Sequence, residues 1–172
     1  MKPTLISTSI LAIALLMFGC GDQKPAASTS QPVKVATPAQ ENFENITTKL
    51  LEPAFGNIDG INNVTSPKLG STVAIKEDKI AIGGFAVDAV KGDAAAGVIV
   101  MIDGKPFVTT YGGERPDIAK ALNNPKYLKS QFYVEIPSAA IGAGLRELKL
   151  RVVASDKSGY YQSDVAIKLD VK

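Results

Sequence analysis

Acidic side chains are the groups through which this chain could most readily catalyse a reaction, because nucleophilic and metal-binding residues are scarce. Its 172 residues include no histidine and a single cysteine, Cys20. This excludes Ser-His-Asp and Cys-His arrangements, an internal disulfide, a zinc knuckle and an iron–sulfur cluster, so we expect no cofactor. A pair of carboxylates flanking a glycosidic bond remains available as a catalyst. Five acids fall near predicted loops: Asp88, Asp93, Asp103, Glu114 and Asp117.

Each of these acids is also typical of a structural position. Asp103 precedes a glycine as turn residues do, Asp117 suits the start of a helix, and Asp93 lies in a glycine-rich loop. The spacing from Asp88 to Asp93 lacks the dense acids of calcium loops. We therefore expect neither an enzyme nor a metal site. An enzyme that uses two carboxylates on a polysaccharide stays open as an alternative.

Tyr111 and Arg115 flank the flexible pair Gly112-Gly113, next to a predicted helix start. Backbone N–H groups at such a start favour anions, so a ligand carboxylate, a phosphate or an acidic residue of a partner could bind there. The simpler interpretation is that Arg115 pairs with a nearby acid and fixes the start of the helix.

Tyr160 and Tyr161 open the last part of the chain as a pair of adjacent aromatics. In a strand, neighbouring side chains point to opposite faces, so we expect one ring in the core and the other at a rim. An exposed ring could stack on a sugar, although the chain contains no tryptophan. A glycan-binding module is therefore a second alternative.

The charge of the chain is almost balanced. Nineteen Lys and Arg stand against seventeen Asp and Glu, which gives a net charge of +2. Nucleic-acid binding needs a clustered basic excess, so we expect no nucleic-acid partner.

The first 19 residues have the pattern of a secretory signal peptide. Lys2 supplies an early positive charge, and the segment from Ile10 to Phe18 is unbroken apolar sequence. A membrane-spanning helix needs about 20 apolar residues, so this segment is too short to be one.

The motif Leu16-Met17-Phe18-Gly19-Cys20 resembles the lipobox of bacterial lipoproteins. The resemblance implies that the signal is cut before Cys20, that its thiol receives a diacylglycerol, and that its new amine is acylated. Several acyl chains make a durable membrane anchor. Gly21 rather than Asp follows the cysteine, which in enteric-type bacteria favours the outer membrane over the inner one.

Residues 20–40 are rich in Ala, Ser, Thr, Gln and Pro and predict a flexible tether with an average reach of roughly 25 Å. Residues 41–53 place Phe43, Ile46, Leu50 and Leu51 at helical spacing. They predict a short amphipathic helix that ends at Pro53.

From residue 54 to residue 172 the apolar period changes to two, which predicts about eight short antiparallel strands and an all-β sandwich. The segment from Val98 to Ile102 is apolar on both faces and predicts a central strand. Asp103-Gly104 after it predicts a hairpin. Ile80 and Ile82 are out of phase with Phe85 and Val87, so we expect a bulge at Gly83-Gly84.

One helix is predicted over residues 115–124, because Pro116 suits its start and Asn123-Asn124-Pro125 its end. Four motifs in this order resemble an immunoglobulin-like β-sandwich module: Gly84-Phe85-Ala86-Val87-Asp88, Val100-Met101-Ile102-Asp103-Gly104-Lys105-Pro106, Arg115-Pro116-Asp117-Ile118-Ala119 and a strand ending in Ile136-Pro137. This module is appended to envelope glycosyltransferase-type membrane proteins and occurs in lipoproteins. The resemblance implies the fold and no enzymatic activity.

These patterns together predict a lipid-anchored lipoprotein of a bacterial cell envelope. Its sandwich is expected to act as a non-catalytic binding or assembly module with a protein partner in the envelope. The alternatives are a glycan-binding module and a carboxylate-based enzyme acting on envelope polysaccharide.

Overall fold

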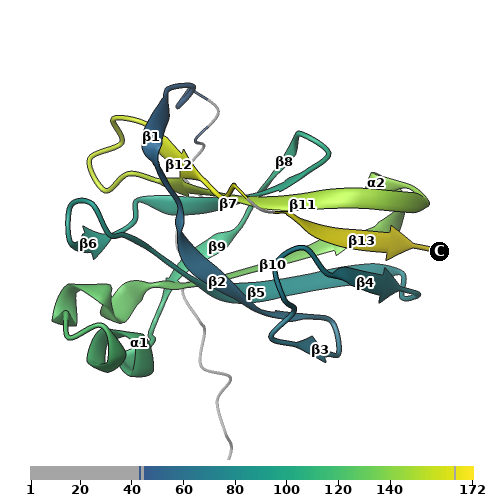
Figure 1. Ribbon diagram of the computed structural model, residues 1–172, viewed down its shortest axis with the longest axis horizontal. Helices are drawn as coiled ribbons and strands as arrows, with labels where there is room; N and C mark the ends of the chain where they lie inside the picture. Colours follow the sequence, from purple (N-terminus) through teal and green to yellow (C-terminus); the bar gives the residue numbers. More distant parts are fainter. Residues whose placement is uncertain (1–42, 44, 165) are drawn as a thin grey trace, which may run out of the picture. The chain divides into compact units, whose positions relative to one another are not determined.

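The computed structural model describes Phe43 and residues 45–164 and 166–172 (Figure 1). The predicted signal peptide (residues 1–19), the lipid attachment at Cys20 and the tether (residues 20–40) lie outside these residues. Within them, no helix is both long and apolar enough to cross a membrane.

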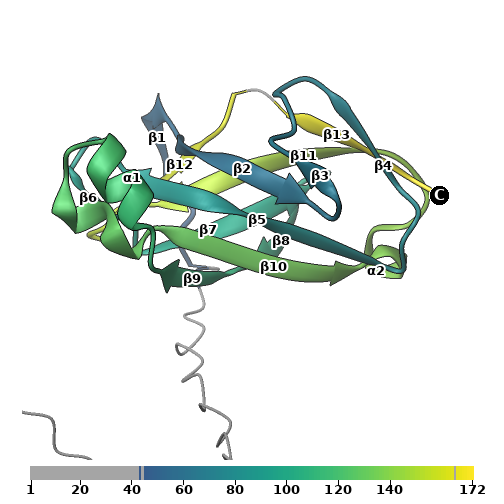
Figure 2. The same ribbon diagram turned by 90° about the horizontal axis from the view of Figure 1, so that it is seen from below.

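The described residues form two facing β-sheets (Figures 1 and 2). In the larger sheet the long strand β11 lies in the middle, with β7 and then β8 on one side and β12 and β13 on the other. At the outer side, β1 pairs in parallel with β12 and β4 pairs in parallel with β13. The strands of this sheet are β1 (Lys49–Pro53), β4 (Thr72–Ile75), β7 (Gly97–Ile102), β8 (Lys105–Val108), β11 (Gly144–Val153), β12 (Tyr160–Gln162) and β13 (Ile167–Val171).

The smaller sheet is antiparallel and has the order β3-β2-β5-β10-β9, with β6 also paired to β5. Its strands are β2 (Phe55–Ile61), β3 (Val64–Thr65), β5 (Lys79–Asp88), β6 (Asp93–Ala94), β9 (Thr110–Gly113) and β10 (Gln131–Pro137). The two sheets confirm the predicted all-β sandwich, although the pairings of β1 with β12 and of β4 with β13 are parallel rather than antiparallel. The described residues form thirteen strands rather than about eight, since several pairings involve only two to four residues.

The core lies between the sheets and follows the predicted alternation. Side chains of β5, β7, β10, β11 and β13 on the inward phase are buried together, as expected for strands with one face in the core. They include Ile80, Ile82, Val98, Val100, Phe132, Ile136, Leu148, Leu150, Ile167 and Leu169. The predicted hairpin is also present, with Asp103 and Gly104 at φ 48° and 83° between β7 and β8, as a type I′ turn requires.

The bulge predicted at Gly83-Gly84 is not found in β5. A bulge occurs instead in the neighbouring strand β2. Strand β5 keeps a regular register with β10 through Gly83 and Gly84, and the irregularity is in β2, between Ile58 and Gly60. Gly84 faces inward where β2 approaches closely, so that a Cβ there would overlap the Asn57 carbonyl oxygen. Phe85 therefore stays on the outer face instead of entering the core.

The helix predicted over residues 41–53 is not found in the described part of that segment, where residues 49–53 form strand β1. Leu51 is 99% exposed, whereas Leu50 packs against the core. The two leucines thus lie on opposite sides of a strand, because backbone pairing with β12 prevails over the helical spacing of the apolar residues.

Phe43 packs on the outer face of the larger sheet. It forms a second apolar cluster with Ile99, Met101 and Val153, and its ring lies over Gly97, where a Cβ would overlap it. This cluster explains why β7 is apolar on both faces.

The predicted helix over residues 115–124 is shorter, α1 (Pro116–Ala121), and is followed by the 3₁₀ helix η1 (Pro125–Lys129). Asn123 adopts a positive φ of 49°, and the Asn124 side chain accepts a hydrogen bond from the Lys126 N–H, which starts η1. These helices lie against the outer side of the smaller sheet, near one end (Figures 1 and 2). A single-turn helix, α2 (Ser138–Ile141), follows β10.

Candidate functional site

A shallow trough crosses the outer face of the smaller sheet. Gly60, Gly83 and Tyr133 are aligned in one row across β2, β5 and β10. Because two of the three positions have no side chain, the sheet surface is hollow there and the Tyr133 ring forms a wall beside it. The trough has a volume of about 330 Å³, within the range of about 300–1,000 Å³ typical of small-ligand sites.

The β2 bulge directs Asp59 to one side of this trough. The Asp59 carboxylate accepts a hydrogen bond from Asn57 Nδ2 at 2.9 Å and pairs with Arg115 Nη1 at 2.6 Å. Bulges commonly re-aim a side chain in this way. Asn62 follows β2 directly and is fixed to β5, because its Oδ1 accepts a hydrogen bond from the Ala81 N–H at 2.7 Å. The β2 side of the trough is therefore rigidly positioned.

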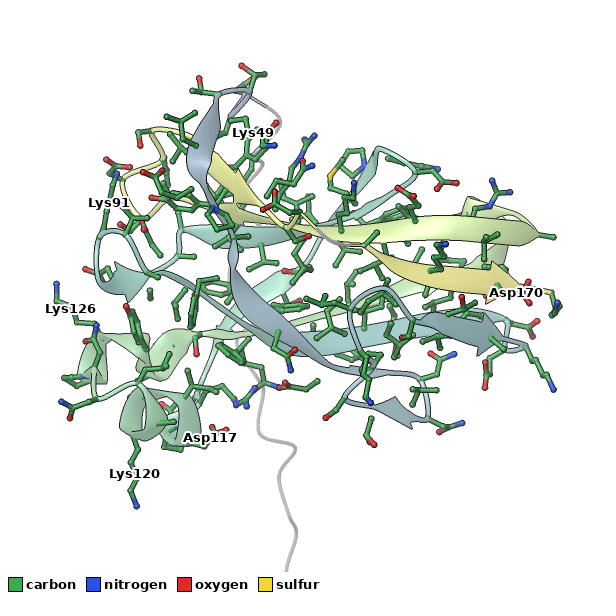
Figure 3. The ribbon with its side chains drawn as sticks, in the orientation of Figure 1. Lys49, Lys91, Asp117, Lys120, Lys126 and Asp170 are labelled. Carbon is green, nitrogen blue, oxygen red and sulfur yellow. The ribbon has the colours of Figure 1, made fainter. Side chains whose placement is uncertain are left out.

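Arg115 closes one end of the trough. Its Nε and Nη2 donate to the two carboxylate oxygens of Asp117 at 2.9 and 2.7 Å, and its guanidinium carbon lies 5.5 Å from the centre of the Phe85 ring. Hydrogen bonding to Asp117 raises the pKa of Arg115 further above its usual value, and the same bonds lower the pKa of Asp117 to about 2. Figure 3 shows Asp117 on α1, whose first turn it belongs to.

Tyr133 presents an exposed ring on the facing wall. Its side chain is 44% exposed, and its hydroxyl donates to Glu135 Oε1 at 2.7 Å. This hydrogen bond raises the pKa of Tyr133 and lowers the pKa of Glu135. Glu135 also forms an ion pair with Lys79 at 3.6 Å. The ring is thereby held in place while its face stays open to solvent.

Tyr111 was a candidate ligand contact in the sequence, but its hydroxyl is hydrogen-bonded to two backbone groups. It accepts a hydrogen bond from the Ala95 N–H at 3.0 Å and donates one to the Ala86 carbonyl at 2.8 Å. Burial raises the pKa of Tyr111. Tyr111 therefore ties β9 to β5 and lies away from the trough, whereas its predicted companion Arg115 lines it.

Neither tyrosine of the Tyr160-Tyr161 pair offers an exposed ring. Tyr161 is in the core, 2% exposed, and burial raises its pKa to about 12. Tyr160 faces the other side of the sheet but is 8% exposed, because the Arg151 guanidinium lies 4.4 Å from its ring centre. Tyr160, which we expected to be an exposed rim residue, is therefore covered by Arg151.

The candidate catalytic acids are held by structural contacts. Asp88 is fully buried and accepts hydrogen bonds from the Ser155 N–H and hydroxyl at 2.8 and 3.0 Å. Asp93 and Glu114 pair with the lysines of η1, and the pKa of each is lowered by that hydrogen bond. Asp103 pairs with Arg146 at 3.2 Å. Lys126, one of these lysines, projects at the helical end of the molecule (Figure 3).

No cluster of three or more metal-binding side chains occurs among the described residues. Other cavities also occur in the described part of the chain. One, of about 230 Å³, opens at the edge between the sheets and includes Asp164, next to residue 165, whose placement is not described. Another, of about 380 Å³, adjoins Phe43, where the described chain begins. The trough, in contrast, lies across the outer face of the smaller sheet between side chains that are held by hydrogen bonds, among them Arg115 and Tyr133.

Sequence reasoning did not identify Tyr133, Asp59 or Gly83 as site residues. One signal was available in the sequence. Tyr133 lies on the outward phase of β10, and the paired strand β5 has only small residues, Ala81 and Gly83, on its outward phase beside it. An aromatic side chain beside small outward residues leaves its ring uncovered by neighbouring side chains, where a ligand can contact it.

No protein-family model and no curated protein sequence matches the chain. Among solved structures, the chain is similar to the endo-beta-1,4-mannanase from Thermotoga petrophila, with a TM-score of 0.41 and 12% identity. The similarity covers 72% of this chain and 20% of that protein.

Proposed function

We propose that this chain is a lipid-anchored lipoprotein of the bacterial envelope whose immunoglobulin-like β-sandwich is a non-catalytic binding module. The lipobox-like motif ending at Cys20 supports the anchor. The two-sheet core supports the fold, as does the crossing at Ala54, where the chain leaves β1 in one sheet and enters β2 in the other.

The observation that carries the binding role is the trough lined by positioned polar groups and an exposed aromatic ring. Asp59, Asn62, Arg115 and Tyr133 all make side-chain hydrogen bonds that fix their geometry. Preorganised side chains lose little freedom when a ligand binds, which favours affinity.

The acids near the trough and the helices fit binding better than catalysis. A glycosidase needs one carboxylic acid that is still protonated near neutral pH, so its pKa must be raised. The pKa values of Asp93, Glu114 and Asp117 are all shifted the other way, by hydrogen bonds to basic side chains. These shifts favour the ionised form of the three carboxylates and do not support a general-acid role for them.

The anchor is tested by Cys20→Ser. We expect the variant to be recovered in the soluble fraction or to accumulate unprocessed, whereas the unchanged chain fractionates with membranes, predominantly the outer membrane. Processing at the same position with unchanged membrane association would contradict the lipoprotein assignment.

The binding face is tested by photo-crosslinking in intact cells. A photoreactive residue at Gln131, which lines the trough, should capture an envelope component. The same residue at Lys49, on β1 of the other sheet, provides the matched control. Equal capture from both positions, or none from Gln131, would contradict the assignment of the binding face.

A further inference from the structure

We infer that the trough binds a neutral saccharide chain, with one sugar ring stacked on Tyr133 above the Gly60–Gly83 floor. This inference rests on the proposed binding function and names the class of ligand. It is carried by three properties of the trough: its shape, its remaining hydrogen-bond capacity and its charge.

The shape suits a flat ring. Gly60 and Gly83 leave the sheet surface open, and a Cβ at Gly83 would lie 3.5 Å from Cδ2 of Tyr133. The floor and the aromatic wall are thus adjacent. A pyranose has an apolar face of C–H groups, and an amphipathic aromatic ring that is partly exposed is suited to cover it.

The hydrogen-bond capacity suits hydroxyl groups, which both donate and accept. Arg115 has five N–H donors, of which the Asp59 and Asp117 bonds use three, so two remain. The Asp59 carboxylate accepts two of the roughly four hydrogen bonds that such a group can take. Gln131 adds an exposed amide. Donors and acceptors therefore occur side by side.

The charge suits a neutral ligand. Arg115 contacts two carboxylates, at Asp59 and Asp117, so an anion would meet their repulsion as well as the guanidinium. An extended peptide is also disfavoured, because the floor strand β5 is paired to β2 on one side and β10 on the other. It has no free backbone edge there for a peptide strand to join.

The test uses isothermal titration calorimetry on the full chain, purified in a detergent without a sugar head group. The probes are β-1,4-linked hexasaccharides of glucose, mannose and N-acetylglucosamine, with hexagalacturonate as the charged counterpart. We expect at least one neutral hexasaccharide to bind and hexagalacturonate to bind at least tenfold more weakly. No binding of any neutral probe, or equal binding of the charged one, would overturn the inference.

Four variants separate stacking from other effects. Tyr133→Ala should weaken binding about tenfold, the upper end of what an aromatic contact contributes, and Tyr133→Phe, which keeps the ring, should stay within about threefold. Gly83→Val fills the floor with a residue that favours strands and should abolish binding. Phe55→Ala is the matched control, because Phe55 is a similarly exposed aromatic on the same sheet outside the trough. Binding that survives Gly83→Val, or that Phe55→Ala reduces equally, would overturn the assignment.

The two proposals can fail separately. Saccharide binding with Cys20→Ser still membrane-bound would refute the anchor alone. If no saccharide binds, but in-cell capture of an envelope protein from position 131 is lost in Gly83→Val, the trough binds protein instead. The saccharide inference is then wrong while the binding-module proposal stands.

Discussion

At the scale of single residues, Arg115 is the candidate contact from the sequence that the structure places at the trough. Its two interpretations were an anion-binding group and an ion-pair partner that fixes the start of the helix. The structure gives it two carboxylate partners, Asp117 two residues away and Asp59 fifty-six residues away. The ion-pair interpretation is therefore sound, and the same residue also closes one end of the trough.

The Arg115–Asp117 pair makes a testable contribution to stability as a function of pH. The pKa of Asp117 falls from an ordinary value of about 3.9 to about 2 in the folded chain. A lowered folded pKa means stabilisation that is present above about pH 4 and is lost as the pH falls towards 2. Asp117→Asn should therefore lower the free energy of unfolding modestly at pH 7 and not at pH 2. Because the side chain is exposed, solvent keeps the effect small.

Urea titrations of the unchanged chain and of Asp117→Asn at pH 7, 4, 3 and 2 measure this difference. In an Arg115→Met background the same substitution should have little effect at every pH. A difference that persists at pH 2, or that grows on acidification, would contradict the assignment.

The limits of sequence reasoning at the site have a physical cause. Tyr133 and Glu135 alternate with Phe132, Val134 and Ile136, and a strand with one buried face sorts its side chains with this period of two, so the outward direction of both polar residues is predictable. The contact of Asp59 with Arg115 depends on a bulge and on the pairing of β2 with β5. No local pattern encodes such a register, so the trough could be recognised only after the strands were paired.

At the scale of elements, the adjacent glycines Gly83 and Gly84 face opposite sides of the same strand. The sequence suggested a bulge at this pair, but the bulge is in β2, and Gly84 provides the space that the bulged backbone occupies. A Cβ at Gly84 would overlap the Asn57 carbonyl oxygen, whereas a Cβ at Gly83 meets only ordinary contacts. The two positions thus have opposite tolerance for a side chain.

Gly84→Ala should accordingly lower the free energy of unfolding by about 2–3 kcal/mol, a typical cost of an overpacked core position. Gly83→Ala should change it by less than about 0.5 kcal/mol or stabilise the chain slightly. Urea midpoints compare the two directly, since both variants add one methyl group to the same strand. Equal effects would show that β2 does not approach β5 as described.

The fold class and most strands could be predicted because the apolar period of two runs through nearly every strand. The segment from residue 41 to residue 53 could not. Its apolar residues have helical spacing, yet residues 49–53 pair with β12, and Phe43 covers the far face of β7. Both outcomes depend on surfaces formed by sequence more than fifty residues further along, which local spacing does not contain.

At the scale of the whole molecule, Phe43 packs the N-terminal end of the described chain onto the larger sheet. Contacts divide the chain into Met1–Lys34 and Val35–Lys172, and Phe43 lies near the start of the second unit. Its ring covers Ile99, Met101 and Val153 on the outer face of the larger sheet, over Gly97. We therefore expect the second unit to fold independently of the first, provided that it retains Phe43.

A chain begun at Val35 should keep the urea midpoint of the full chain. We expect Phe43→Ala to cost about 3 kcal/mol, and a chain begun at Lys49 to be at least as destabilised, because it also loses Ile46 and the Thr48 carbonyl that accepts the Tyr160 N–H. A double-mutant cycle identifies the contact. Gly97→Ala should cost about 2 kcal/mol when Phe43 is present, because the new methyl group overlaps its ring, and little once Phe43 is alanine. Additive costs would mean that the two residues do not touch. A Val35 chain as unstable as the Lys49 chain would mean that the first unit stabilises the sandwich.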